Sequence, residues 1–142
     1  MSISTRGRYG LRALLDLAAQ KAGKPVPLSD IAQRQAISEG YLEQLMACLK
    51  KAGLVQSTRG VQGGYVLTRK PDEITVLQVL TPLENSLTPA TCVSEESAFY
   101  CERQEYCPTR FLWQKVKEAM DHVLSSYTLA DLLQKGKEQK EA

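Results

Sequence analysis

Three cysteines, Cys92, Cys101 and Cys107, lie close together in the second half of the chain with the spacing C-x8-C-x5-C. Three thiols on one flexible segment can converge on an iron–sulfur cluster, for which thiolates are the usual ligands. Zinc is disfavoured because no C-x2-C pair is present, and disulfides are disfavoured in a reducing cytosol. The spacing therefore predicts an iron–sulfur site. Three unrelated cysteines are the alternative.

Cys107 directly precedes Pro108, a residue well suited to the first position of a helix. A helix N-terminus lowers the pKa of a thiol and favours the thiolate. A fourth ligand is not evident, because the one histidine, His122, lies about 20 Å further along that helix at ~1.5 Å per residue. Glu102, Glu105 or a group from a second subunit are the candidates. We expect a 2Fe–2S cluster rather than a 4Fe–4S cluster, although the residues do not fix its type.

The cysteines lie in residues 85–107, which are polar and have no sustained periodicity. A loop of this length inside a compact domain is usually functional. On its N-terminal side, we expect Thr75 to cap a short helix that runs to about Leu80, with Pro82 ending or kinking it.

On the C-terminal side, the pattern predicts one long helix from Pro108 to about Tyr127. Its apolar stripe is wider than a single small domain needs, which favours a homodimer seam; a stripe packed within the chain is the alternative. Thr128 is expected to open a further short helix with Asp131 in its capping box. The charged tail after Lys135 is expected to fray. The stripe consists of Leu112, Val116, Ala119, Met120, Val123 and Tyr127, widened by Phe111 and Leu124.

Positive charge is concentrated in the N-terminal half of the chain. Residues 1–70 contain 11 lysines and arginines against 4 acidic residues, whereas residues 71–142 contain 7 against 12. A polyphosphate partner favours such a basic half, because each phosphate contact releases counterions. A solvated basic surface is the alternative, and charge alone does not separate the two.

The first basic residues belong to a helix predicted from Thr5 to about Gln20. Arg6, Arg8 and Arg12 lie in or beside its first turns, where positive charge opposes the helix dipole. A phosphate contact would account for this placement.

Residues 28–53 have the layout of a helix-turn-helix. Ser29 is expected to cap the first helix and Ser38 the second, with Ile37 filling the angle between them. Gly53 is expected to end the second helix in a left-handed conformation. The apolar residues of the second helix are spaced to face one core and comprise Leu42, Leu45, Met46 and Leu49.

The other face of the second helix, near residues 39–52, is expected to enter the major groove of DNA. Glu43 can accept from the amino group of cytosine, and Gln44 can pair with adenine. Ser38 or Tyr41 can bind phosphate, and Lys50 lies on the same face. A solvent-exposed glutamate is the alternative for Glu43.

Two short runs of β-forming residues follow, separated by a glycine-rich tip, and predict a hairpin wing over residues 54–68. Arg59 is placed to enter a narrow minor groove. Gly60, Gly63 and Gly64 would permit backbone approach to phosphates. The glycine spacing matches neither the phosphate-binding loop nor G-x-G-x-x-G.

The bulk composition argues against other classes of protein. With 142 residues the chain is about one domain long. No apolar run approaches the ~18 residues of a membrane span, and the N-terminus has no apolar signal region. No nucleophile–base pair, metalloprotease motif or phosphate loop is present, and there is a single histidine. We therefore expect a cytoplasmic protein that is not an enzyme and has no membrane contact.

These motifs resemble the bacterial winged-helix regulators typified by the iron–sulfur cluster regulator IscR, the nitric-oxide sensor NsrR and the cysteine-metabolism repressor CymR. The resemblance covers nearly the whole chain and implies a homodimeric transcription regulator, with one long helix per subunit crossing its partner. It also implies that Tyr41, Glu43, Gln44 and Arg59 contact double-stranded operator DNA. The matching residues are Gly7-Arg8-Tyr9, Val26-Pro27-Leu28, Ile31-Ala32, Ile37-Ser38, Tyr41-Leu42-Glu43-Gln44-Leu45, Leu49-Lys50-Lys51-Ala52-Gly53-Leu54-Val55, Arg59-Gly60, Gly63-Gly64-Tyr65, Leu112-Trp113 and Thr128-Leu129.

The chain departs from the IscR-like pattern at the cysteines. That pattern has a closer C-x5-C-x5-C spacing and a histidine three residues after the last cysteine, where this chain has Arg110. Arginine stays protonated and is a poor ligand. We expect a regulator, in the first instance a repressor, whose operator affinity depends on the cluster. The alternative is a cluster-free regulator of the CymR type that responds to a partner protein or to thiol oxidation.

The predicted fold class is mainly α with a small β-hairpin wing. Residues 1–70 are expected to form the winged helix-turn-helix domain, 71–107 a connecting helix and the cysteine-containing sensor loop, and 108–142 the dimerisation helix and C-terminal tail.

Overall fold

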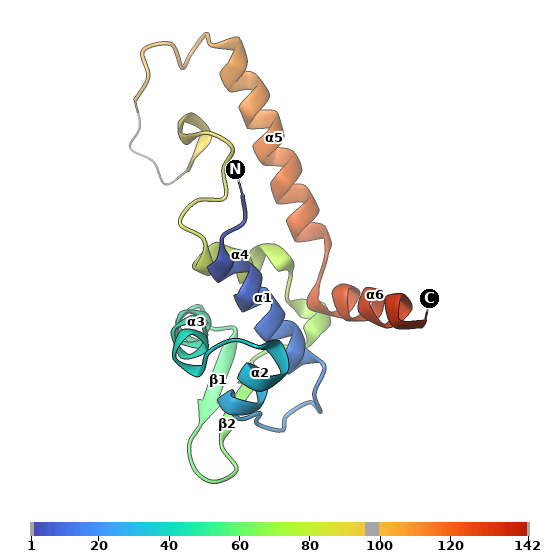
Figure 1. The fold of residues 1–142 in the computed structure, drawn as a ribbon. Helices are drawn as coiled ribbons and strands as arrows, with labels where there is room; N and C mark the ends of the chain where they lie inside the picture. The colour runs from blue at the N-terminus through green and yellow to red at the C-terminus, as the bar shows by residue number, and fades with distance from the viewer. Residues whose placement is uncertain (1, 96–99, 142) are drawn as a thin grey trace.

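The protein is mainly helical with one small hairpin, as predicted. The computed structural model describes residues 2–95 and 100–141 (Figure 1). Residues 96–99 of the predicted cysteine loop lie outside the described residues. The elements in order are α1 (Thr5–Ala18), α2 (Leu28–Gln35), α3 (Glu39–Lys51), β1 (Val55–Thr58), β2 (Gly64–Leu67), the 3-10 helix η1 (Pro71–Glu73), α4 (Val76–Leu83), the 3-10 helix η2 (Thr91–Val93), α5 (Pro108–Ser126) and α6 (Leu129–Glu141).

Helices α1 to α4 and the hairpin form a compact winged-helix body, from which α5 extends as a long arm (Figure 1). The start of α6 joins the core of this body, because Leu129 is fully buried there. The apolar stripe of α3 faces this core as its spacing predicts. The largest fully buried side chains are Leu14, Ile31, Leu42, Leu45, Met46, Leu49, Val55, Ile74, Val79 and Leu129.

The turn between α2 and α3 is tight. Ala36 adopts a left-handed conformation with φ 54°, which an alanine side chain tolerates more easily than a larger one. Ile37 is buried in the angle between the helices, and the Ser38 hydroxyl accepts from the Tyr41 N–H at 3.3 Å, so both predictions are confirmed. The prediction that Ser29 caps α2 is wrong. Helix α2 already begins at Leu28, after Pro27, without a side-chain cap.

The predicted hairpin is present as the antiparallel pair β1–β2, with Val55 opposite Leu67 and Thr58 opposite Gly64. Gly64 has φ 151°, and a Cβ there would overlap the backbone of Val26. This close approach lets Tyr65 and Val26 exchange backbone hydrogen bonds of 2.8 and 3.0 Å. The hairpin is thereby anchored to the segment that leads into α2.

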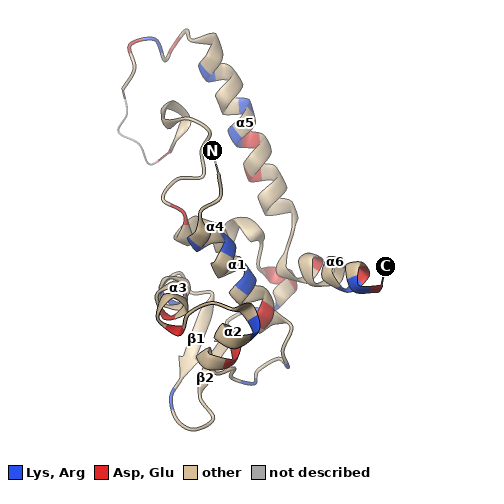
Figure 2. Ribbon diagram, in the orientation of Figure 1, with Lys and Arg blue, Asp and Glu red and all other residues tan. Residues whose placement is uncertain are grey.

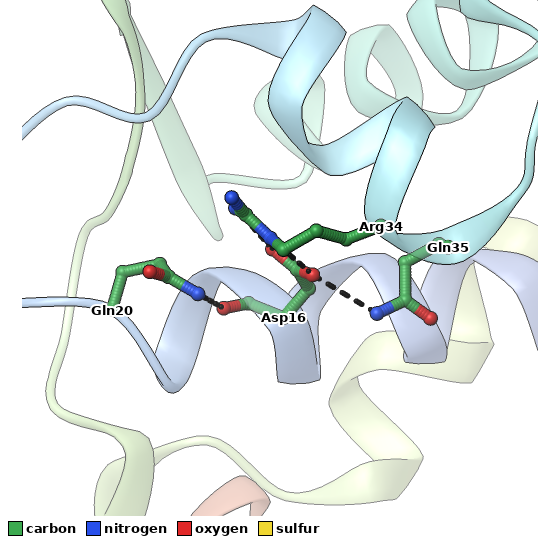
Figure 3. Close-up of polar contacts among 4 residues, drawn as sticks. All are labelled: Asp16, Gln20, Arg34 and Gln35. Carbon is green, nitrogen blue, oxygen red and sulfur yellow. Dashed lines mark hydrogen bonds and ion pairs between the residues drawn. The ribbon is translucent and has the colours of Figure 1, made fainter.

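A buried carboxylate joins α1 to α2 (Figure 3). Asp16, whose side chain is 4% exposed, accepts two hydrogen bonds from Arg34 Nε and one from Arg34 Nη2, at 2.8 to 3.2 Å. Gln35 Nε2 donates to the same carboxylate at 2.9 Å. Hydrogen bonds satisfy the buried charge, and they fix α2 against α1.

Helix α4 is longer than predicted. Thr75 caps it as expected, in a reciprocal pair with Gln78. The helix continues past Leu80 to Leu83 with Pro82 inside its last turn. Proline removes only one backbone donor there, and the Glu84 N–H still bonds to the Leu80 carbonyl at 2.9 Å.

Two backbone hydrogen bonds clamp the junction of α5 and α6 to the start of α4. The Val76 N–H donates to the Tyr127 carbonyl at 2.9 Å, and the Leu129 N–H donates to the Ile74 carbonyl at 3.0 Å. The arm therefore leaves the body from a fixed base.

Helix α6 corrects the prediction of a frayed tail. The predicted capping box of Thr128 and Asp131 is present, and the helix then continues through Lys135 to Glu141. The charged residues of this stretch are good helix formers, and Lys135 pairs with Glu138 one turn later. In the part of the chain that the structure describes, no helix is long and apolar enough to cross a membrane.

Candidate nucleic-acid interface and cysteine segment

The outward face of α3 carries the side chains predicted to read DNA. Ser38, Glu43, Gln44 and Lys50 are exposed, and Tyr41 is half-buried. Helix α3 begins at Glu39, and Glu39 and Gly40 are exposed, so its N-terminal end is free to meet base edges.

The three arginines of α1 have different surroundings. Arg8 is exposed and donates to Thr5 Oγ1, one turn earlier, at 3.2 Å. Arg12 donates to the Gln35 carbonyl at 2.6 Å, at the end of α2. Arg6 is half-buried and donates to other helices. Arg8 is therefore the arginine of α1 most available to a phosphate.

An aromatic pair connects these arginines to the start of α3. The rings of Tyr9 and Tyr41 meet edge to face, with centroids 6.1 Å apart. The guanidinium groups of Arg8 and Arg12 lie 5.9 and 5.2 Å from the Tyr9 ring. The sequence identified Tyr41 but did not single out Tyr9, although Tyr9 belongs to the Gly7-Arg8-Tyr9 motif that carries the family resemblance. Together these contacts fix the position of Tyr41.

The wing presents Arg59 and Gly60 at its exposed tip. Gly60 has φ 107°, which the turn requires and only glycine adopts easily. Gly63 and Gly64 are half-buried, and the nearest atoms to a Cβ at either position are protein backbone. Lys50 Nζ donates to Ser57 Oγ at 2.7 Å, so α3 and the wing are joined by a side-chain contact.

Charge is distributed unevenly over this body. Figure 2 shows lysine and arginine positions along α1 and on the hairpin, and positions of both charges on α2 and α3. Glu43 is thus an exposed carboxylate on the same helix as the exposed Gln44. A carboxylate facing phosphates is repelled unless a base donor meets it, so Glu43 can reject wrong bases.

The three predicted ligand cysteines lie in the segment between α4 and α5. Cys92 lies in η2, Cys101 in the loop, and Cys107 at the N-cap of α5; all three are free and half-buried. Three thiols fit the ligand chemistry of an iron–sulfur cluster. Within residues 2–95 and 100–141, however, no three His, Cys, Asp or Glu side chains lie close enough to hold one metal ion. A cluster on these ligands therefore requires another arrangement of the loop.

Cys107 has the acidified thiol that the sequence predicted. The Thr109 hydroxyl lies 3.0 Å from the sulfur and is the main cause of a lowered Cys107 pKa. The backbone N–H of Arg110, in the first turn of α5, lowers the pKa further. The helix N-terminus contributes as expected, but the Thr109 hydroxyl contributes more.

Arg110, which replaces the histidine of the IscR-like pattern, binds the loop instead. Its Nε donates to the Cys92 carbonyl at 3.3 Å. Lys117 lies about two turns after Arg110 on the same side of α5. It donates to Asp121 at 2.7 Å and lies 4.0 Å from Glu95. These contacts hold the η2 end of the loop against α5.

The arm has an unusual burial pattern for a long helix. None of the 19 residues of α5 is buried. Val116, Met120 and Leu124 are half-buried. The remainder of the predicted stripe faces outward, and its exposed large side chains are Phe111, Leu112, Val123 and Tyr127. Trp113, which was not assigned to the stripe, is also exposed.

Comparison with known proteins identifies the family. Residues 3–135 match the Rrf2 family, described as an iron-dependent transcriptional regulator. The chain is 44% identical to "Protein rrf2" of Nitratidesulfovibrio vulgaris over 133 residues, covering 94% of this chain and 87% of that protein. The structure of T. potens IscR is 42% identical, has a TM-score of 0.81, and the match covers 100% of this chain and 93% of that one.

A second solved structure is also similar. CymR, the global cysteine regulator of B. subtilis, is 41% identical with a TM-score of 0.76, covering 94% of this chain and 97% of that one. The predicted fold class, a winged helix-turn-helix followed by a long helix, is therefore confirmed. The chain belongs to the Rrf2 family of DNA-binding transcriptional regulators, which are not enzymes.

Proposed function

We propose that the protein is a homodimeric regulator, and specifically a repressor, whose affinity for a pseudo-palindromic operator depends on an iron–sulfur cluster. DNA binding is supported chiefly by the exposed face of α3, the helix that Ser38 caps. This helix contacts α1 through Tyr9 and Tyr41, and it contacts the wing through Lys50. The site of action is the cytoplasm, where bacterial DNA is.

Each candidate residue has a role that follows from its exposure. Glu43 and Gln44 face base edges in the major groove, and Arg59 enters the adjacent minor groove. The phosphate contacts are assigned to Arg8, Ser38, Tyr41, Lys50 and the backbone of Gly60, with Gly63 and Gly64 shaping the turn.

A homodimer is supported by the outward apolar side chains of α5. Leu112 and Val123 are 51% and 53% exposed, and Phe111 is 66% exposed. Large exposed apolar patches mark interaction sites. A second copy of α5 crossing this face would cover them and would place two copies of α3 on successive half-sites.

We assign the cluster to Cys92, Cys101 and Cys107, with 2Fe–2S preferred. The lowered Cys107 pKa supports thiolate ligation. When bound, the cluster would make the loop responsive to iron supply and to oxidants, because both would change how much of the protein carries a cluster. The chain's own contribution is to hold one end of the loop on α5 through Arg110 and the other at Cys107. A group that orders the loop changes operator affinity only if it favours one of two conformations.

Operator binding is tested first by titrating the protein into a labelled duplex at several salt concentrations. Arg59→Met should weaken binding and reduce the salt slope by about one, because a phosphate-proximal charge is lost. Lys140→Met removes the same charge from the far end of α6 and is the matched control. Equal salt slopes in the two variants would remove Arg59 from the interface.

The cluster is tested by anaerobic purification, with iron and sulfide analysis and visible absorption. Cys92→Ala, Cys101→Ala and Cys107→Ala should each lower iron content, whereas Cys48→Ser should retain it. Operator affinity that is the same in wild type and all three alanine variants would end the cluster-switch proposal and leave DNA binding intact.

The CymR-like similarity supports the second candidate, a cluster-free regulator that responds to a partner protein or to thiol oxidation. Its supporting observation is that the described cysteines are not gathered for one metal. Colourless, iron-free protein from anaerobic cells, with operator affinity that changes on mild oxidation, would favour this reading.

A further inference from the structure

The N-terminal turn of α1 packs against side chains at the C-terminal end of α4. A Cβ at Gly7 would overlap Glu84 Oε1, and a Cβ at Gly10 would overlap the Leu83 side chain. Glycine inside a helix costs about 1 kcal/mol relative to alanine. Both glycines lie on the face of α1 that meets α4, so this cost is offset by a contact between the two helices.

Hydrogen bonds also join the start of α1 to the end of α4. The Glu84 carboxylate accepts from Ser4 N at 2.9 Å and from Ser4 Oγ at 2.8 Å. Ser4 Oγ in turn accepts from the Gly7 N–H, as the N-cap of α1. Glu84 is the residue at which the chain leaves α4 and enters the cysteine loop. The start of that loop is therefore tied to the cap of α1.

Arg6 extends this contact to α3. Its Nε donates to the Leu83 carbonyl at 3.3 Å, and its Nη2 donates to Cys48 Sγ at 3.0 Å. The Leu83 carbonyl is one of the last four of α4, which a helix leaves without internal partners and which attract a cation. One half-buried guanidinium thus bonds to both α3 and α4.

We propose that Arg6 and Glu84 are positioning residues, which set the orientation of α3 against the end of α4 and carry displacements of the cysteine loop to the DNA-binding helix. The guanidinium is engaged within the protein, so its role is distinct from the phosphate contact expected of an arginine on α1. The inference rests on the proposed function in that α3 is the helix that reads DNA.

The first test needs no DNA. Amide hydrogen exchange is measured in wild type, Arg6→Met, Glu84→Gln and Lys21→Met, the last removing an equal charge beyond α1. Arg6→Met should raise exchange in α3 by about fivefold or more relative to α2, and Glu84→Gln should act in the same direction. Lys21→Met should match wild type. Unchanged exchange in α3 of both Arg6→Met and Glu84→Gln would overturn the proposal.

The second test replaces the sulfur partner and leaves Arg6 in place. Cys48→Ala should lower the preference for operator over unrelated duplex by about threefold without altering the salt slope, because no phosphate contact is lost. Cys48→Ser retains an acceptor and should restore the preference. Equal preferences in Cys48→Ala and wild type would overturn the proposal, as would a lower salt slope in Arg6→Met with unchanged α3 exchange. Wild-type duplex binding without salt dependence would instead refute the proposed function, and the exchange result would stand by itself.

Discussion

Helices α3 and α5 have similar apolar patterns but different surroundings. The stripe of α3 is fully buried in the body, with Leu42 and Leu45 at 0% exposure. The stripe of α5 is half-buried at best, and Val123 is 53% exposed. The spacing of apolar residues predicts a helix in both cases. Only the structure shows whether the same chain provides the surface that packs against the apolar stripe. The core of the body is complete within this chain, whereas α5 has an uncovered apolar face.

The largest expected effect lies in the buried helix. Leu45→Ala should lower the free energy of unfolding by about 2–5 kcal/mol, because a fully buried side chain is replaced by a cavity. Urea titration measures this, and the loss should not depend on protein concentration. The exposed Ala47→Ser on the same helix should change stability by no more than about 0.5 kcal/mol. Equal losses in the two variants would contradict the burial assigned to α3.

The corresponding change on α5 should act on assembly. Val123→Asp places a charge on the face assigned to the dimer and should raise the dimer dissociation constant on the order of a hundredfold, or about 2.7 kcal/mol. Sedimentation velocity over a range of concentrations measures the shift. Ser125→Asp adds the same charge on the opposite side of α5 and should leave the constant unchanged. If the wild-type protein stays monomeric at high concentration, the apolar face of α5 is simply exposed to solvent and is not a dimer interface.

The difference between the two regions also explains what the sequence could predict. Local signals, such as the Ser38 cap, the stripe of α3 and the glycines of the wing, specify the helix-turn-helix and the hairpin, and the structure has them where expected. The partners of Arg6 and Arg12 were not predictable, because they depend on helices brought together by the fold. Proximity to the α1 terminus instead suggested a phosphate contact for both.

In the cysteine segment, the acidified thiol of Cys107 could be predicted from the sequence, but the contacts around it could not. The spacing identified Cys92, Cys101 and Cys107, and the position before Pro108 indicated an acidified thiol. The Thr109 hydroxyl that dominates the Cys107 pKa and the bond from Arg110 to the Cys92 carbonyl are side-chain contacts with no period or motif of their own. The length of α6 was missed because a charged tail and a charged helix have the same composition.

Removing an ion pair should also cost more stability in the body than in the arm, but the difference should be smaller. Asp16→Asn should lower the free energy of unfolding by about 1–3 kcal/mol, because a carboxylate that is 4% exposed loses its charge-assisted bonds to Arg34. Glu118→Gln removes an acid of the arm whose side chain is 54% exposed, and should cost at most about 0.5 kcal/mol. Thermal or urea unfolding measures both. A cost for Glu118→Gln as large as that for Asp16→Asn would contradict the distinction.

The smallest effect concerns the Cys107 thiol at the N-terminus of α5. The Thr109 hydroxyl lowers the Cys107 pKa, so the thiolate is present at a lower pH than for an ordinary cysteine. Thr109→Val removes that hydrogen bond, so the Cys107 pKa should rise toward its usual value, the thiolate fraction at neutral pH should fall, and alkylation should slow. Thr109→Ser keeps the hydroxyl and should keep the wild-type rate. The pH profile of iodoacetamide labelling, resolved by peptide mass, measures the shift at Cys107 against Cys101 in the same chain. Identical profiles in the valine and serine variants would assign the acidity to the α5 terminus alone, since the backbone N–H of Arg110 is present in both.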